Sequence, residues 1–487
     1  MDPFLAAHYR GHGAVFDLAD RLTLISIRDQ MIRGSLMADR LPSFLEEKWG
    51  VIKTPGERVL VIGAGATGFC AAAGIANQGF VVEVVDKNSL PFILQRNCHT
   101  RWIDPTQYDW PLDHWREGKF PLPLVGCKSS VVTWQANYAN KIVTDYWTPS
   151  LNRLLGRHGE SLKMLPECKA ILEDLRIDNN TGLHWIRIVP VNSKEQTEDD
   201  FRGYRAVIVA RGAGPEWTRP GRPPKRNEQG ERTKLFTFQG YRFWEADPFE
   251  KKHCGLDNKD LEGNVVVSGT GDGALQDFLR VVTRKKSARD IYDVLISDRR
   301  MPNLNKIHSA EHRAERGINW SVGPKQTSGY LRNLHDTHLG EVEELMKANK
   351  GLHTRLEELI QDGPKNLYLI SPQQYFTCSY ALNRFLALLF VRFLESRNRL
   401  TVYYNRRIES VDRKDAPLNP TAAQCLGKVW TVKLVANGEA VENSSNVVEL
   451  SANVLILRHG LDAPESELSP PFRLLPMPRP HAPTYLA

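Results

Sequence analysis

The sequence lacks paired cysteines. Its seven cysteines stand singly along the chain, and none forms a C-x-x-C pair. A disulfide framework is therefore not expected, and scattered single thiols are typical of a protein in a reducing compartment. The N-terminus also carries no basic start followed by an apolar core. These two absences predict a cytoplasmic protein without a signal peptide.

Long apolar runs are also missing. The most apolar stretch, Phe385–Phe393, contains Arg392. It is far shorter than the ~20 residues that a helix needs to span a bilayer. We therefore expect no membrane-spanning segment and no membrane partner.

A strong charge of one sign is absent as well. The formal net charge is +7 over 487 residues, and the basic residues gather only in short clusters, at 219–234, 284–286 and 299–300. No basic stripe with interleaved aromatic residues stands out, so no nucleic-acid partner is expected. A content of 41% hydrophobic and 25% charged residues is typical of soluble globular proteins, and the length allows two or three domains.

A glycine turn between two apolar runs is the strongest motif that is present. The run at 59–62 leads into G-x-G-x-x-G at 63–68, and a helix pattern of small residues continues to Ala76. A second apolar run at 81–85 ends at Asp86. This order of strand, turn, helix and strand predicts a dinucleotide-binding unit rather than a plain crossover whose glycines serve packing alone.

Each residue type in this turn has a physical role. Gly63 allows the tight turn, Gly65 lets the backbone approach a pyrophosphate, and Gly68 lets helix and strand pack closely. The helix N-terminus supplies N–H donors for the phosphates, and Asp86 stands where a carboxylate bonds a ribose hydroxyl. The predicted contacts of this first site are Gly63, Ala64, Gly65, Ala66, Thr67, Gly68, Asp86 and Lys87.

The same order of strand, glycine turn, helix and strand is predicted in the second half of the chain. A strand pattern at 264–268 enters a second glycine turn at 269–274, and a helix pattern follows at 275–282. A strand is predicted at 291–297, ending at Asp298. The second half therefore also predicts a nucleotide-binding unit.

The second turn is less regular than the first. Asp272, inside the turn, would face a pyrophosphate unfavourably. Asp298 lies further from its glycines than the usual ~20 residues, and a carboxylate there favours NAD. Arg299 and Arg300 follow it and favour NADP, unless they belong to a solvated turn. The predicted contacts of this second site are Gly269, Gly271, Asp272, Gly273 and Ala274.

Each half closes in the same way. A helix predicted at 138–155 and short strands precede the buried strand at 204–214. In the second half a helix ending at 394 and short strands precede the strand at 453–460. The sequence thus predicts an α/β fold of two Rossmann-like dinucleotide-binding units with β-meanders, an N-terminal helical extension and a helical insertion in the second unit. The expected parts are an N-terminal extension (1–50), a first unit (51–218), a linker (219–262), a second unit (263–462) with its insertion (301–360), and a proline-rich tail (463–487).

The loop after the first unit's second strand holds the candidates for chemistry. Rossmann ligands lie beyond the carboxyl ends of strands, so a loop at 97–115 can reach a bound cofactor. His99 can titrate near neutral pH, Arg101 can hold a phosphate or a carboxylate, and Trp102 can cover a flat ring. The alternative is a loop tied down by aromatic packing and salt bridges. Candidate catalytic residues are His99, Arg101 and Tyr108, and candidate cofactor contacts here are Arg101 and Trp102.

Two histidine pairs have helical spacing. His308 and His312 are four residues apart, and His335 and His338 are three apart. Such pairs can bind zinc, but histidines on solvated helix faces are far commoner, and no cysteine stands at metal spacing. No metal site is therefore predicted.

Four motifs resemble the two-dinucleotide-binding-domain FAD/NAD(P)-dependent oxidoreductases, which include glutathione reductase-like enzymes and flavin monooxygenases. They are the first glycine turn with Asp86, the strand AVIVARGAGPE at 206–216, the turn VVVSGTGDGA at 265–274 and the strand VLILRHG at 454–460. The resemblance implies FAD at the first turn, with Gly212 among its contacts, and NAD(P)H at the second turn.

The chain departs from this family at named positions. Arg211 and Arg458 stand where the family usually has Thr, and no Gly-Asp motif follows near the C-terminus. No C-x-x-C follows Gly68, which excludes the disulfide-reductase branch.

Three functions remain open at the level of sequence. The first is an FAD-dependent oxidoreductase that passes hydride between NAD(P)H, flavin and a small-molecule substrate or oxygen. The second is a dinucleotide-binding sensor or regulatory protein without turnover. The third is an amino-acid-oxidase-like flavoenzyme that needs no NAD(P)H. The sequence names neither the substrate nor the pathway, and it allows an oligomer.

Overall fold

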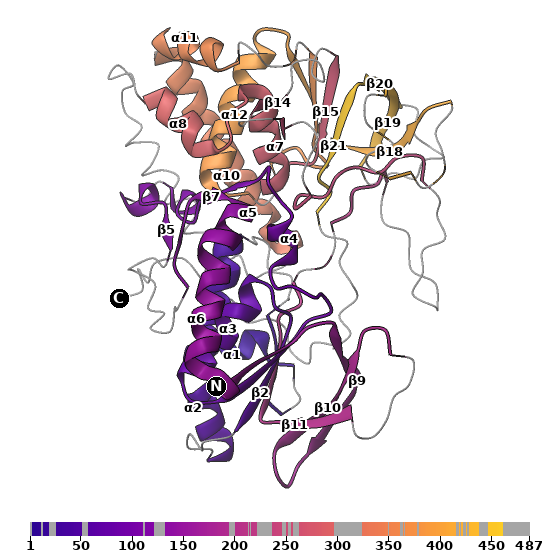
Figure 1. The fold of residues 1–487 in the computed structure, drawn as a ribbon. Coiled ribbons are helices and arrows are strands. Elements are labelled where there is room, and N and C mark those ends of the chain that lie inside the picture. The colour runs from indigo at the N-terminus through magenta and orange to yellow at the C-terminus, as the bar shows by residue number, and fades with distance from the viewer. Residues whose placement is uncertain are drawn as a thin grey trace.

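The architecture is two parallel sheets, one in each half of the chain. In Figure 1 the first unit, in indigo and purple, lies below the second, in orange and yellow. The computed structural model describes residues 2–10, 13–18, 26–50, 57–110, 113–120, 132–193, 200–212, 214, 216–221, 236–245, 250–251, 255–256, 263–296, 324–348, 350–360, 364, 366–376, 379–414, 418, 420–421, 425, 428–437 and 447–460.

The first sheet is built around the predicted glycine turn. Its strands are all parallel, in the order β1-β12-β2-β3-β8. The predicted strands and helix of the first glycine unit are confirmed, as is the buried closing strand. Their bounds are β1 Val15–Asp17, β2 Arg58–Ile62, α3 Ala66–Asn77, β3 Val81–Val85, β8 Leu162–Leu165 and β12 Ala206–Val209.

The N-terminal extension belongs to this unit. α1 (Pro3–His8) and α2 (Ile27–Trp49) are the helices expected there, and α2 packs along α3. The strand β1 was not predicted, because three residues are too few to show an alternating pattern. Pairing with β12 adds it to the edge of the sheet.

Helices and a meander follow β3. The helix predicted at 138–155 is confirmed, with a π-helical turn in its middle. Its parts are α5 Ala139–Ile142, η3 Val143–Trp147 and α6 Thr148–His158. The antiparallel meander is β9 Cys168–Asp178, β10 Leu183–Pro190 and β11 Phe201–Tyr204. Shorter elements are α4 Ile93–Arg96, β4 Trp102–Ile103, η1 Gln107–Asp109, η2 Asp113–Arg116, β5 Lys119–Phe120, β6 Trp134–Gln135, β7 Asn137–Tyr138 and η4 Gly159–Ser161.

The second unit repeats the plan. Its parallel sheet has the order β17-β16-β15-β21, and an antiparallel meander β18-β19-β20 stands beside it. The bounds are β15 Asn264–Ser268, α7 Asp272–Thr283, β16 Asn366–Ile370, α12 Ala381–Glu395, β17 Leu400–Tyr403, β18 Arg406–Asp412, β19 Trp430–Ala436, β20 Val448–Ala452 and β21 Val454–Leu457. The linker adds two short strands, β13 Glu250–Lys251 and β14 Gly255–Leu256.

One predicted strand is wrong. Residues 291–296 belong to a helix, α8 (Ala288–Ile296). Ile291, Tyr292 and Leu295 are buried, which is the spacing of one helix face, and Ser287 Oγ accepts a hydrogen bond from the N–H of Asp290. Asp298, Arg299 and Arg300 lie outside the described residues.

The second strand of this unit comes after the insertion. β16 pairs with β15 in parallel, with Asn264 opposite Asn366. The insertion is helical where it is described, in α10 (Pro324–Ala348) and α11 (Lys350–Leu359). Topology therefore confirms two Rossmann-like units. The second unit has a large helical insertion between its glycine turn and its second strand, β16.

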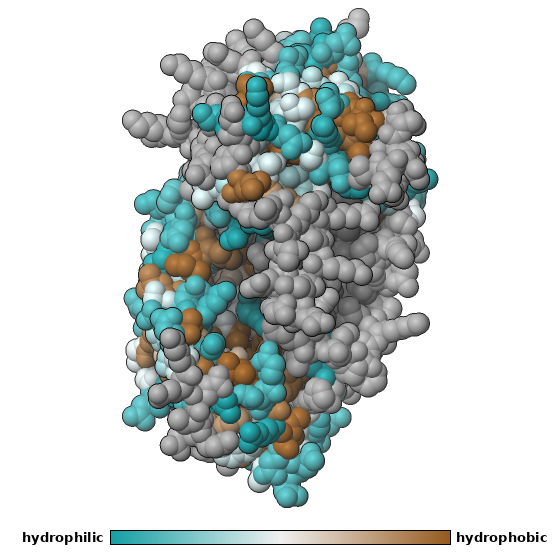
Figure 2. All heavy atoms as spheres, turned by 90° about the vertical axis from the view of Figure 1, so that its right-hand side faces the viewer, coloured by the Kyte–Doolittle hydropathy of each residue, from teal (hydrophilic) through white to brown (hydrophobic). Residues whose placement is uncertain are grey.

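The described surface shows no membrane-spanning feature. Within the described ranges, no helix is long and apolar enough to cross a bilayer. Among the coloured, described residues on the face drawn in Figure 2, hydrophobic atoms are scattered between hydrophilic ones.

Candidate dinucleotide site and the interface between the units

Close backbone contacts shape the first glycine turn. Gly63 has a φ of 112°, and a Cβ there would lie 2.5 Å from the carbonyl oxygen of Ala210. A Cβ on Gly68 would lie 1.8 Å from the carbonyl oxygen of Gly63. No side chain fits at either position, so both glycines are required by this strand–helix approach.

The middle of the turn is open. A Cβ on Gly65 would meet nothing within 4 Å. The first intrahelical bond of α3 runs from the N–H of Phe69 to the carbonyl of Gly65, at 2.9 Å. The N–H groups of Ala66, Thr67 and Gly68 therefore have no acceptor within the helix. Together with the helix dipole, these donors favour an anion beside Gly65.

Asp86 is fixed at the rim of this turn. Its Oδ2 accepts a hydrogen bond from the N–H of Ala64 at 2.6 Å, and its Oδ1 accepts from the backbone and side-chain nitrogens of Asn88, each at 2.8 Å. The residue is half-buried, and its neighbour Lys87 is exposed. A carboxylate has about four acceptor positions, so Asp86 keeps capacity for a ligand hydroxyl.

The residues around the first turn fit the dinucleotide that the resemblance implies. Gly212 follows β12, the strand next to β2, and has a φ of 83°. Like Gly65, it has nothing within 4 Å of its Cβ position. Open backbone at both positions, beside N–H groups that have no acceptor within the helix and one carboxylate, is what a pyrophosphate and its ribose require. Arg211, which stands next to Gly212, is exposed.

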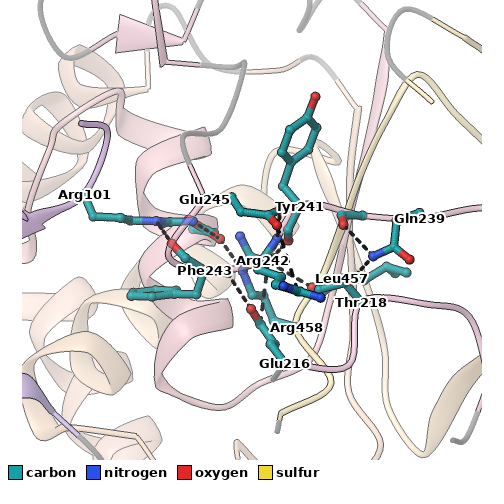
Figure 3. Close-up of polar contacts among 12 residues, drawn as sticks. Arg101, Glu216, Thr218, Gln239, Tyr241, Arg242, Phe243, Glu245, Leu457 and Arg458 are labelled. Atoms are coloured by element: carbon teal, nitrogen blue, oxygen red, sulfur yellow. Dashed lines mark hydrogen bonds and ion pairs between the residues drawn. The ribbon is translucent and has the colours of Figure 1, made fainter. Parts of the chain in front are cut away.

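Arg101 lies in the interface between the units. Its guanidinium forms a double contact with the carboxylate of Asp277 on α7, including Nη2 to Oδ2 at 3.1 Å. Its Nε donates to the carbonyl oxygen of Phe243 at 2.8 Å. Figure 3 shows Arg101 reaching this group of residues from one side. The structure thus joins a first-unit loop to a second-unit helix through a buried ion pair.

Asp277 is the centre of a charge cluster. Besides Arg101, it accepts from Nε of Arg458 at 2.7 Å and from Nη1 of Arg280 at 2.9 Å. Burial acts to raise the pKa of Asp277, but the three guanidiniums outweigh it and hold that pKa well below its usual range. Asp277 is therefore a carboxylate at any ordinary pH.

The rest of the loop after β3 is also packed into the interface. Tyr108 is buried, and its ring centroid lies 4.3 Å from that of Tyr380. Asp109 accepts from Arg28 at 2.5 Å, and Trp110 stacks on Phe385 at 5.4 Å. These contacts match the alternative of a loop tied down by aromatic packing and salt bridges.

The other loop candidates lie at the edge of this interface. Trp102 is half-buried, with the Nζ of Lys286 3.7 Å from its ring centroid. His99 is exposed. The structure therefore brings Arg101 and Tyr108 to the second unit but leaves His99 at the surface.

The second glycine turn has the expected backbone. Gly269 has a φ of 116°, and a Cβ there would lie 2.2 Å from the carbonyl oxygen of Arg458. Helix α7 begins with a bond from the N–H of Leu275 to the carbonyl of Gly271, at 3.0 Å. The N–H groups of the three residues between them, Asp272, Gly273 and Ala274, have no acceptor within the helix.

The side chains around the second turn differ from those of the first. Asp272 accepts from the N–H of Tyr380 at 3.0 Å and from the side chains of Asn383 and Gln276, each at 2.7 Å. Burial raises the pKa of Asp272, and these hydrogen bonds act in the opposite direction. The carboxylate thus ties the turn to the start of α12.

No carboxylate follows the second strand of this unit. β16 ends at Ile370, and the next residue, Ser371, contacts the hydroxyl of Thr270 at 3.2 Å. The ring of Phe243 lies 3.2 Å from the Cβ position of Gly273. In this conformation the second turn does not fit a dinucleotide in the way the first does.

Sequence reasoning missed the residues that join the units. Asp277 and Phe243 belong to no sequence motif. Glu216 ends the strand motif at 206–216, Arg101 is a loop candidate and Arg458 departs from the family pattern, but none of these three is predicted to join the units. Asp277 lies 181 residues from Arg458, and Glu216 lies further still from the same arginine, separations that no spacing rule detects.

Of the two histidine pairs, His335 and His338 are described, and both side chains pack within the protein. His335 Nδ1 accepts from the N–H of Phe376 at 3.2 Å, and His338 is fully buried. In the ranges that the structure describes, no three His, Cys, Asp or Glu side chains are grouped as metal ligands would be. His308 and His312 lie outside those ranges.

Comparison with known proteins finds similarity only to solved structures. No protein-family model matches the chain, and no curated protein matches it. The bacillithiol disulfide reductase from Staphylococcus aureus is 11% identical over 84% of this chain and 77% of its own, with a TM-score of 0.37. The thioredoxin reductase of T. acidophilum is 12% identical (84% and 78% covered, TM-score 0.33), and that of Lactococcus lactis 10% (83% and 78%, TM-score 0.34). The two parallel sheets, each entering a glycine turn, confirm the resemblance of the sequence motifs at the level of fold.

Proposed function

We propose that the chain is an FAD-dependent oxidoreductase whose FAD is held at the first glycine turn. The observation that carries the proposal is the open backbone at Gly65 beside the N–H groups that start α3 and have no acceptor within that helix. The same turn carries Asp86 at its rim, in the position expected for a ribose contact.

Each residue of the turn has a role in this proposal. The N–H groups of Ala66, Thr67 and Gly68 bind the pyrophosphate, and Asp86 bonds the ribose of the ADP half. Gly65 and Gly212 let the cofactor approach the backbone. A bound flavin would supply the hydride chemistry and pass the hydride to a small-molecule substrate or oxygen. The protein's part is to position the flavin.

A second candidate function is a dinucleotide-binding regulatory protein without turnover. It is favoured by one observation. Arg101 and Tyr108, two of the three candidates for catalysis, are buried in contacts between the units. Groups fixed in this way are not free to move a proton to or from a substrate in this conformation.

The test is the visible spectrum of the purified protein together with a matched pair of variants. Gly65 and Gly156 both have open space around their Cβ positions, so neither G65A nor G156A introduces a clash. We expect a yellow protein with flavin absorption bands. G65A weakens FAD binding at least tenfold, whereas G156A leaves it unchanged. A colourless protein that still binds ADP-ribose refutes the flavoenzyme and supports the regulatory protein.

A further inference from the structure

A segment of the linker crosses the second glycine turn. We call residues 238–244 the strap. At one end Phe238 packs against Trp430 in the core of the second unit's meander, with ring centroids 5.1 Å apart. At the other end Trp244 packs against the core of the first unit. The strap therefore connects both units across their interface.

The strap places an aromatic ring directly on the turn. Two ring atoms of Phe243 lie 3.2 and 3.4 Å from the Cβ position of Gly273. Gly273 lies among the residues whose N–H groups start α7 and would face a pyrophosphate. The ring therefore lies against a residue of the helix start that would bind the phosphate, and it narrows the approach to that backbone.

Polar contacts from three parts of the chain hold the strap in place (Figure 3). Glu216, after β12, accepts from the N–H of Phe243 at 2.5 Å. Arg458, after β21, donates from Nη1 to the carbonyl of Tyr241 at 2.5 Å. Arg101, from the first unit, donates to the carbonyl of Phe243, and its guanidinium lies 4.3 Å from the centroid of that ring. Such charge-assisted bonds are the stronger class of hydrogen bond.

We infer that the strap is an intramolecular gate on the second glycine turn, and that a nicotinamide dinucleotide binds there only after Phe243 has moved off Gly273. The structure is then the closed form. Arg101 of the first unit and Arg458 of the second both bind the carboxylate of Asp277. Because each also bonds a carbonyl of the strap, both units hold the strap in this position. The role of the gate in turnover rests on the proposed function, whereas the binding event itself requires no flavin.

The gate is tested by calorimetric titration of the full-length protein with NADPH and with NADH. The variant F243A removes the ring from the turn. Y241A is the matched control, because Figure 3 shows the Tyr241 ring directed away from Arg458. We expect F243A to bind the preferred nucleotide at least tenfold more tightly than the wild type, and Y241A to bind as the wild type does.

Amide hydrogen exchange on the wild type gives a readout that needs no variant. The N–H of Phe243 is bonded to Glu216 in the closed form, so saturating nucleotide should speed its exchange. Equal affinity of wild type and F243A overturns the gate. So does binding without faster exchange of the strap, or no binding by either folded protein. A colourless protein that shows the expected pattern supports the gate and refutes the flavoenzyme.

Discussion

Arg101 and Asp277 form a buried ion pair that joins the loop after β3 of the first unit to α7 of the second. The guanidinium and the carboxylate are 3% and 4% exposed, and the pair shares Asp277 with Arg458 and Arg280. Such a cluster of one buried carboxylate and three guanidiniums stabilises the fold only while it is complete. Removal of the carboxylate leaves the buried guanidinium charges uncompensated.

Substitution of this carboxylate is therefore expected to destabilise the protein strongly. D277N should lower the free energy of unfolding by roughly 3–5 kcal/mol, measured by urea denaturation, because it leaves buried guanidiniums unneutralised. D293N is the control, since Asp293 is 50% exposed and lies 3.7 Å from Arg116. It should change stability by less than about 1 kcal/mol. A small effect of D277N would show that the cluster does not hold the units together.

The contact between α2 and α3 leads to a second prediction. A Cβ on Gly34 would lie 2.2 Å from the carbonyl oxygen of Thr67 and 3.0 Å from the backbone of Ala71. G34A should therefore push the helices apart and cost roughly 1–3 kcal/mol in thermal or urea unfolding. Gly340, within α10, has open space around it, so G340A should stabilise by about 0.5–1 kcal/mol. If G34A were stabilising too, the close crossing of the two helices would be wrong.

Tyr380 links the start of α2 to the second unit. Its hydroxyl donates to Asp29 and accepts from the N–H of Ser26 at 3.1 Å, while its own N–H donates to Asp272. Y380F keeps the ring but leaves the Asp29 carboxylate and the Ser26 N–H without this partner. We expect a loss of about 1–3 kcal/mol in unfolding free energy. Y403F should change little, because no hydrogen bond of the Tyr403 hydroxyl is described and the ring keeps its contact with Tyr368.

Acid is expected to weaken the fold through His335. Burial, with repulsion from Arg384 and Arg392, lowers the pKa of His335 from 6.5 to about 4. The unfolded chain therefore takes up a proton at a higher pH than the folded protein does. The stability contributed by the neutral ring is complete above about pH 6.5 and is lost as the pH falls towards 4, by up to about 3 kcal/mol.

Urea unfolding at several pH values between 7 and 4 tests this. The wild type should lose stability steadily over that range, and H335Q should lose less, because the titrating ring is gone. The exposed His99 provides the control H99Q, which should follow the wild type. An unchanged pH dependence in H335Q would assign the acid sensitivity to other groups.

The glycine units could be read from the sequence because their signal is local. The run at 59–62, the turn at 63–68 and the strand at 81–85 follow one another within 30 residues and fold as predicted. The second unit interrupts that order. Its second strand, β16, follows a long insertion, whereas the apolar residues of α8 stand at the place along the chain where an uninterrupted unit predicts that strand.

The interface was beyond sequence reasoning for a different reason. Arg101 was expected at a cofactor because an arginine beyond a strand end suits a phosphate. The partner that the structure gives it, Asp277, is 176 residues away and has no feature in the sequence that distinguishes it from other helix carboxylates. Long-range pairing of charges leaves no periodic signal, so only the structure shows which cation each carboxylate neutralises.

The position of the helical insertion also determines when each sheet can be completed during synthesis. β15 pairs on one side with a strand that starts at Asn366 and on the other with one that starts at Val454. β1, near the N-terminus, pairs with Val207 to Val209. Both sheets thus need segments that leave the ribosome long after their first strands, a high contact order that slows folding. Until those segments emerge, the nascent chain carries apolar strand edges that a holding chaperone would have to cover.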